Sequence, residues 1–183
     1  LESLGFNNVV RLDFAKEYNL INTNLVISLL KSGDFRDDSG IYFSYGNFTG
    51  LFDVDSNMIN FNKVPKVDLY ASSFAGGASG YPIMFDNYNS KEKIKIINKK
   101  KNFIKSQNLK MIKRINPKFF LPYAGFFKEK LSRDKTVYNM NIKNSIKDYL
   151  NFCHKNNIQL LDVDANDEFI FSNKNLIPCL IEE

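Results

Sequence analysis

The sequence has a single histidine, His154, and two cysteines, Cys153 and Cys179, among its 183 residues. A zinc centre built from several histidines therefore cannot be assembled from this chain alone. The two cysteines are far apart and match no C-x-x-C metal pattern, so we expect both to be reduced and buried. His154 lies between Cys153 and Lys155, and we expect it to face solvent from a helix.

Long apolar segments are also lacking. No run approaches the roughly 20 apolar residues of a membrane span, and no signal peptide is visible. The expectation of reduced cysteines suits a cytoplasmic protein. The hydrophobic content of 44% excludes a chain that is disordered by composition. No interdomain linker or repeat is evident, so residues 1–183 are expected to form one domain. Because the sequence starts at Leu1 rather than at a methionine, an upstream portion is expected to be missing.

The net charge of +5 comes largely from residues 91–118, within one expected helix. Two interpretations stay open: a solvated helix face, or a surface for a phosphate-bearing partner. Binding of nucleic acid through these lysines is a third alternative, and it predicts affinity that falls steeply with salt.

The hydrophobic pattern indicates strands first and helices later. The expected strands are residues 8–12, 22–30, 41–45, 48–54, 67–71, 158–161 and 168–171, and residues 119–127 are expected to form a strand followed by a turn. The expected helices are residues 90–115, capped by Ser90, and residues 144–156, with Ile146, Tyr149, Leu150 and Cys153 on one face. This order predicts an α/β (α+β sandwich) fold in which the early strands pair antiparallel. Pro122 indicates a strand edge or a strand end.

A glycine-rich run follows the expected strand at residues 67–71. Residues 72–82 read Ser-Ser-Phe-Ala-Gly-Gly-Ala-Ser-Gly-Tyr-Pro and offer almost no side chain for packing. Glycine allows close approach of the main chain, and α/β proteins often place a ligand at the carboxyl end of a strand. The run is neither a Walker loop nor G-x-G-x-x-G.

Carboxylates also gather at expected strand ends: Asp53, Asp55, Asp162, Asp164 and Asp167. Such positions suit a hard metal or proton transfer, but aspartates also cap turns routinely. The segment from Asp162 is not a calcium loop, because Asp167 and Asn173 stand where glycine and glutamate are required. A Ser-His-Asp hydrolase is unsupported, since no Gly-x-Ser-x-Gly elbow is present.

The chain has 17 phenylalanines and 9 tyrosines. Phe119, Phe120 and residues 126–127 are expected in the core. Tyr81 and Tyr123 each lie next to glycine, alanine or proline, and are better placed to contact a ligand.

Four segments together resemble one enzyme family. Residues 73–82 are similar to the DFAGGASGFP signature of CMP-N-acetylneuraminic acid hydroxylases, and residues 116–127 to their QPRIYCPFAGYF. Residues 139–144 resemble their ETNTKN, and residues 41–55 resemble a hairpin ending in Val-Asp. The resemblance covers roughly residues 30–145.

This resemblance implies part of a metallo-β-lactamase-like αββα fold, namely the C-terminal part of that domain. In the family, a Rieske [2Fe-2S] domain delivers electrons for oxygen-dependent hydroxylation of an N-acetyl group on a sugar nucleotide. Asp55 matches the aspartate at the metal site, where iron or zinc would bind. The sequence departs from the family at Ser73, which replaces an acid, and it lacks both the His-x-His-x-Asp-His and the Cys-x-His motifs.

The leading hypothesis is therefore part of a metal-dependent enzyme that hydroxylates a sugar nucleotide or phosphorylated sugar, with an electron-transfer partner. The expected substrate-binding residues are Ser73, Gly76, Gly77, Ser79, Tyr81, Tyr123, Lys113 and Arg114, the last two neutralising phosphate. A metallo-β-lactamase-fold hydrolase and a non-catalytic carbohydrate- or nucleotide-binding relative remain as alternatives. By itself, this chain is expected to be inactive.

Overall fold

The computed structural model describes residues 2–7, 9–35, 37–56, 64, 66–76, 80–125, 131–164, 167–172 and 175–178. Seven strands form one sheet in chain order. They are β1 (Glu17–Asn19), β2 (Leu25–Lys31), β3 (Ser39–Tyr45), β4 (Phe48–Asp53), β5 (Leu69–Ser73), β6 (Phe119–Tyr123) and β7 (Gln159–Leu160). The first four pair antiparallel and the last four pair parallel, which confirms the predicted α/β class and the antiparallel start.

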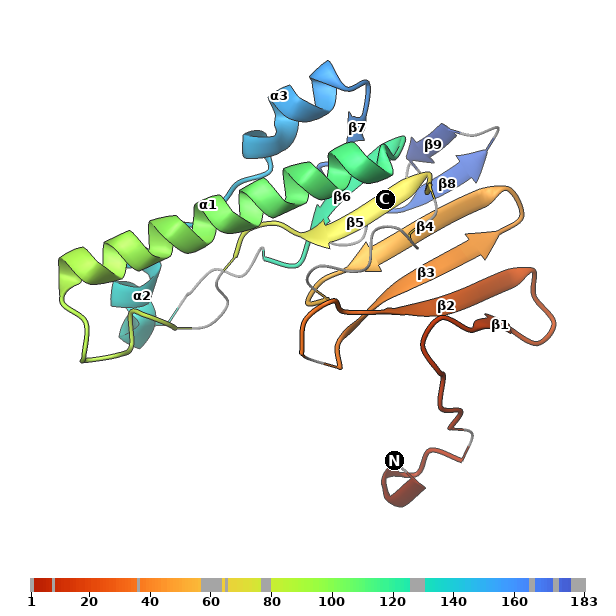
Figure 1. Cartoon of the computed structure of the whole chain (residues 1–183), viewed down its shortest axis with the longest axis horizontal. Helices are drawn as coiled ribbons and strands as arrows, with labels where there is room; N and C mark the ends of the chain where they lie inside the picture. The colour runs from red at the N-terminus through yellow and green to blue at the C-terminus, as the bar shows by residue number, and fades with distance from the viewer. Residues whose placement is uncertain are drawn as a thin grey trace.

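Three helices follow β5. They are α1 (Ser90–Ile115), α2 (Lys135–Met140) and α3 (Lys147–Lys155). A separate hairpin joins β8 (Phe169–Ser172) to β9 (Asn175–Pro178), and short 3₁₀ turns lie at Glu2–Leu4 and Ser132–Asp134. Figure 1 shows α1 running lengthwise beside β5 and β6, with its N-terminal half extending past the sheet.

The helix α1 has the predicted bounds, but its cap is Asn89 rather than Ser90. The Asn89 Oδ1 accepts from the backbone N–H groups of Lys91 and Glu92, at 3.0 and 3.1 Å, and Glu92 Oε2 accepts from the Asn89 N–H at 2.8 Å. This reciprocal capping box satisfies backbone donors that the first turn leaves free. At the other end Asn116 adopts a left-handed conformation, with φ of 49°.

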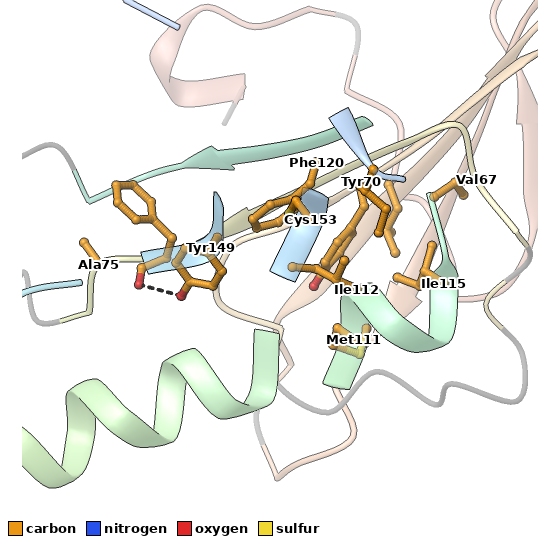
Figure 2. Close-up of a cluster of buried hydrophobic side chains, with 12 residues drawn as sticks. Val67, Tyr70, Ala75, Met111, Ile112, Ile115, Phe120, Tyr149 and Cys153 are labelled. Atoms are coloured by element: carbon orange, nitrogen blue, oxygen red, sulfur yellow. Dashed lines mark hydrogen bonds between the residues drawn. The ribbon is translucent and has the colours of Figure 1, made fainter. Parts of the chain in front are cut away.

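The core lies between the sheet and the helices (Figure 2). Tyr70 and Phe120 project from the central strands and stack with ring centroids 5.8 Å apart, and Ile112 of α1 is fully buried in the same cluster. Tyr149 and Cys153 bring α3 into this core, so Cys153 is buried as predicted, and burial raises the pKa of its thiol to about 11. Cys179 lies outside the described residues.

A second apolar cluster contains Phe48, Leu69, Phe119 and Leu161, with Phe43 and Phe52 packed against it. Alternation along a strand places Leu69 and Phe119 on the opposite side of the sheet from Tyr70 and Phe120. The predicted burial of Phe119 and Phe120 is confirmed, whereas residues 126–127 lie outside the described part. Pro122 is the second-to-last residue of β6, and β7 pairs only with Phe119 and Phe120, in agreement with a strand end.

Three predictions about elements were wrong. Residues 9–12 form no strand; Val9 and Val10 are exposed, and β1 forms at Glu17–Asn19 instead. Leu150 is 53% exposed rather than buried, because the face of α3 that packs against the core carries Tyr149 and Cys153. The helix predicted from residue 144 begins at Lys147, since Asn144 is used for a tertiary contact described below. His154 is exposed as predicted.

Candidate functional site

The carboxyl ends of β4, β5 and β6 meet at one edge of the sheet. The register aligns Asp53 with Ser72 and Ser73 with Tyr123. Parallel strands necessarily end together at such an edge, and open α/β sheets bind their ligands there. Candidate site residues from three separate segments of the sequence therefore lie together at this carboxyl edge.

Asp53 is the buried carboxylate of the edge. Its Oδ1 accepts a hydrogen bond from Ser56 Oγ at 2.5 Å, and its Oδ2 accepts one from the Tyr70 hydroxyl at 3.4 Å. Burial is the largest influence on this carboxyl and raises its pKa to about 6, against the lowering effect of those two donors. Asp55, the predicted metal ligand, follows two residues later and is exposed.

Tyr123 lies half-buried at the end of β6. Its ring meets Phe52 edge-on, with centroids 5.5 Å apart. Burial raises the pKa of its hydroxyl to about 12, and the negative charges of Asp53 and Asp55 contribute further. Tyr123 therefore lies within electrostatic reach of both aspartates and remains a protonated hydrogen-bond donor at neutral pH.

The glycine-rich turn begins directly after Ser73 at this same edge. Gly125, which follows β6, lies so close to it that a Cβ there would be 2.5 Å from Ala75 Cβ. The two segments that carry the family resemblance, residues 73–82 and 116–127, thus pack against each other. Gly77 and Ser79 lie outside the described residues.

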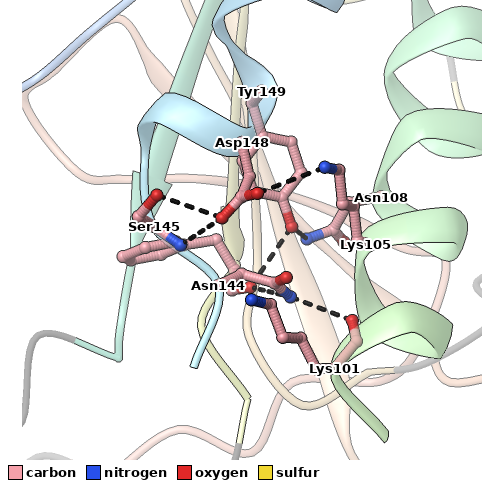
Figure 3. Close-up of polar contacts among 8 residues, drawn as sticks. Lys101, Lys105, Asn108, Asn144, Ser145, Asp148 and Tyr149 are labelled. Atoms are coloured by element: carbon pink, nitrogen blue, oxygen red, sulfur yellow. Dashed lines mark hydrogen bonds and ion pairs between the residues drawn. The ribbon is translucent and has the colours of Figure 1, made fainter. Parts of the chain in front are cut away.

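Three successive carbonyl groups fix the start of this turn. Figure 3 shows Asn108, Asn144 and Tyr149, the side chains that make these contacts. Asn108 Nδ2 of α1 donates to Ser73 O at 2.8 Å, and the Tyr149 hydroxyl donates to Phe74 O at 3.2 Å. Asn144 Nδ2 donates to Phe74 O at 3.1 Å, while its backbone N–H donates to Ala75 O at 3.1 Å. The turn is therefore bound to both α1 and α3 by buried side chains, none of which was singled out for this role from the sequence.

Tyr81 lies beyond the turn and faces α1. Its ring is edge-on to Phe85 and Tyr88, and the Lys100 ammonium lies 5.2 Å from its centre. The structure thus brings Asp55, Ser73 and Tyr123 to the carboxyl edge, with Gly76 and Tyr81 in the adjoining turn.

Lys113 and Arg114 lie elsewhere. The bond from Asn108 to Ser73 places Asn108 level with the end of β5, and Ile115 packs with Val67 at the strand's beginning. The helix α1 therefore runs antiparallel to β5, and its last turn lies at the amino edge of the sheet. Both basic residues are exposed there. A role for them at the carboxyl edge stays a prediction without support from their position.

A complete metal centre is not formed by the described residues, among which no three His, Cys, Asp or Glu side chains are grouped suitably. Asp162, Asp164 and Asp167 are exposed after β7 and make no such group with Asp53 and Asp55. No helix within the described ranges is long and apolar enough to cross a membrane.

The chain is similar to enzymes of one curated group. It is 30% identical to the cytidine monophosphate-N-acetylneuraminic acid hydroxylase of Pan troglodytes over 140 residues, which are 74% of this chain and 24% of that protein. The Xenopus laevis hydroxylase is 31% identical over 128 residues, or 68% of this chain and 22% of the relative. The human protein, named as an inactive hydroxylase, is 30% identical over 140 residues, 74% of this chain and 28% of its own length.

These similarities support the family relationship indicated by the glycine-rich motif. The chain spans about a quarter of the length of these curated relatives. No family model matches the sequence.

Proposed function

We propose that the chain is part of a hydroxylase that acts on a CMP-linked N-acyl sugar. The observation that supports this most directly is the packing of residues 73–82 against residues 116–127 at the carboxyl edge, because these are the segments that resemble the hydroxylases. The relatives' names give the reaction and the sugar nucleotide. The ligand contacts of the proposed pocket would come from the glycine-rich turn, Tyr81 and Tyr123.

The fold we propose for the intact domain is the metallo-β-lactamase-like αββα sandwich. In that arrangement a second sheet covers the face opposite the helices. The second apolar cluster supplies a suitable surface, since Phe43 and Phe52 are only partly buried on that face. A packed inner face of this kind is the usual basis of a two-sheet core.

Within the site we propose Asp55 as one metal ligand and Asp53 as its buried neighbour. The described residues do not fit a whole metal centre, so the remaining ligands of an iron or zinc ion would come from outside them. We also propose, from the family resemblance alone, a Rieske cluster and an electron-transfer partner. What the chain's own residues do is clearer: Asp53 orients Ser56 and Tyr70, and Tyr123 offers a hydroxyl donor at the edge.

A non-catalytic relative that binds a carbohydrate or nucleotide is the second candidate. Two observations favour it: Ser73 replaces the acid of the family motif, and the human relative is named inactive. A metallo-β-lactamase-fold hydrolase is the remaining alternative from the sequence, and no separate structural observation favours it.

The test is elemental analysis of the full-length gene product beside its Asp55→Ala variant, with Asp86→Ala, an exposed loop position, as the matched control. Stoichiometric iron or zinc that is lost only with Asp55, together with hydroxylation of CMP-N-acetylneuraminate, would support the enzyme. Absence of metal from the intact protein, with binding of CMP retained, would favour the non-catalytic relative.

A further inference from the structure

We propose that the hollow between α1 and the glycine-rich turn binds the phosphate group of the ligand, with Lys100 and Lys101 neutralising its charge. This inference rests on the proposed function and refines it, because it assigns the phosphate to two lysines other than Lys113 and Arg114. The hollow is lined by the turn at Gly76 and Tyr81, by α1 at the two lysines, and by Ile142 of the segment before α3.

The size of the hollow limits what it can hold. Its enclosed volume is about 10 Å³, close to the minimum for one water molecule. The larger volume of about 260 Å³ includes open solvent at the mouth. A single phosphate group would therefore bind in the mouth, against the two lysines, and the rest of the ligand would lie outside it.

The two lysines are half-buried and have no counterion among the residues that the structure describes. Apart from the contact of Lys100 with the Tyr81 ring, at 5.2 Å, their ammonium groups form no ion pair or hydrogen bond with any residue in the described part of the chain. The next lysine along this helix face differs, because Lys105 pairs with Asp148 at 3.3 Å. An anion bound in the hollow would be attracted by the charges of both lysines.

The opposite wall of the hollow is main chain. Gly76 adopts a φ of 76°, and a Cβ there would lie 2.6 Å from Ile104 Cδ1 of α1. The turn therefore approaches the helix more closely than a larger residue would allow. No side chain from Gly76 fills the hollow, so a small ligand group can reach the backbone.

The carbonyl groups at the start of the turn are already occupied. Those of Ser73, Phe74 and Ala75 accept hydrogen bonds from interior donors on Asn108, Tyr149 and Asn144. Of these three residues only Ala75 lines the hollow, and its carbonyl oxygen already accepts a hydrogen bond from the Asn144 N–H.

The test is calorimetric titration of the full-length gene product with CMP, inorganic phosphate and the uncharged nucleoside cytidine. We expect Lys100→Gln and Lys101→Gln each to weaken CMP binding about ten-fold, which corresponds to roughly 1.4 kcal/mol. Cytidine binding should be unchanged, and Lys100→Arg should restore most of the lost affinity. The matched control is Lys99→Gln, which removes an exposed charge from the same helix turn and should leave CMP affinity within about two-fold.

Failure of this site and failure of the proposed function give different results. Unchanged CMP affinity in the Lys100→Gln/Lys101→Gln double variant would overturn the site, even if the wild type hydroxylates CMP-N-acetylneuraminate. Weakened CMP and phosphate binding in that variant, with no hydroxylation by the wild type, would support the site and contradict the function. A wild type that binds neither CMP nor phosphate would overturn the site as well.

Discussion

The side-chain amide of Asn144 joins Phe74, just after β5, to Lys101 in the middle of α1. Its Nδ2 donates to the two backbone carbonyl oxygens at 3.1 and 3.0 Å, and the residue is only 4% exposed. One buried side chain thereby holds the glycine-rich turn and the helix at a fixed separation. Lys101 lines the proposed anion site, so the same contact positions both walls of the hollow.

The first prediction concerns this contact. Asn144→Ala removes two buried hydrogen bonds and should lower the free energy of unfolding by roughly 2–3 kcal/mol, measured by chemical denaturation. Asn156→Ala is the matched control, because Asn156 Nδ2 also donates to a backbone carbonyl, Phe152 O at 2.8 Å, but at an exposed position. For Asn156→Ala the free energy of unfolding should fall by no more than about 0.5 kcal/mol. Equal losses in the two variants would contradict the role of Asn144.

The second prediction concerns two serines near the carboxyl edge. The buried Ser72 Oγ has no hydrogen-bond partner of good geometry within the described ranges, although its proximity to the Tyr70 hydroxyl lowers the pKa of that group. In contrast, Ser56 Oγ donates to buried Asp53. Ser72→Ala should therefore be neutral or stabilising by up to about 1 kcal/mol, since it removes an unsatisfied polar atom. Ser56→Ala should cost roughly 1–3 kcal/mol, because it leaves a buried carboxylate with one donor fewer. Thermal and chemical unfolding of both variants at pH 7 would check this, and the reverse order of stability would refute it.

The third prediction concerns the close approach of β3 and β4. A Cβ on Gly50 would lie 2.3 Å from the Phe43 ring, so Gly50→Ala must displace an aromatic side chain of the second apolar cluster. We expect a loss of about 1–3 kcal/mol from this overpacking.

The comparison for that variant is Gly46→Ala in the hairpin turn. Gly46 has open space around it but a φ of 55°, so its replacement should cost about 1 kcal/mol through backbone strain alone. Chemical denaturation of both proteins separates the two causes. A larger loss for Gly46→Ala than for Gly50→Ala would show that Phe43 moves aside freely.

Local signals explain what the sequence could predict. The bounds of α1 follow from its apolar period and from residues near its ends, and the hairpin between β3 and β4 follows from Gly46 and Asn47. The position of the glycine-rich turn at the carboxyl edge could also be predicted, because it directly follows an apolar strand.

Long-range contacts explain which features of the structure could not be predicted from the sequence. Asn108 and Tyr149 reach Ser73 and Phe74 across 35 and 75 residues of sequence, and no local pattern marks such pairs. Asn144 was expected within a helix, yet its side chain is used in the core. The place of Lys113 at the amino edge could also have been predicted. A helix that leaves the carboxyl edge and returns to the next parallel strand must end at the amino edge.

The last prediction concerns pH and the start of α3. Asp148 Oδ2 accepts from the Ser145 N–H at 2.7 Å and from Ser145 Oγ at 3.0 Å, and Oδ1 pairs with Lys105. The bond from the Ser145 backbone is the largest favourable influence and, with the others, holds the pKa of Asp148 below its usual 3.8. A carboxyl whose folded-state pKa is lowered stabilises the protein above its unfolded pKa, and this contribution is lost as the pH falls through the folded value.

Wild type should therefore exceed Asp148→Asn in unfolding free energy by about 1 kcal/mol at pH 7. This difference should shrink steadily as the pH is lowered from about 5 to 2.5 in denaturation series at constant ionic strength. Ser145→Ala serves as the contrast, because it keeps the backbone donor and loses only the hydroxyl. It should retain most of the pH dependence of the wild type. A difference between wild type and Asp148→Asn that stays constant across this range would show that the charged carboxylate does not stabilise the start of α3.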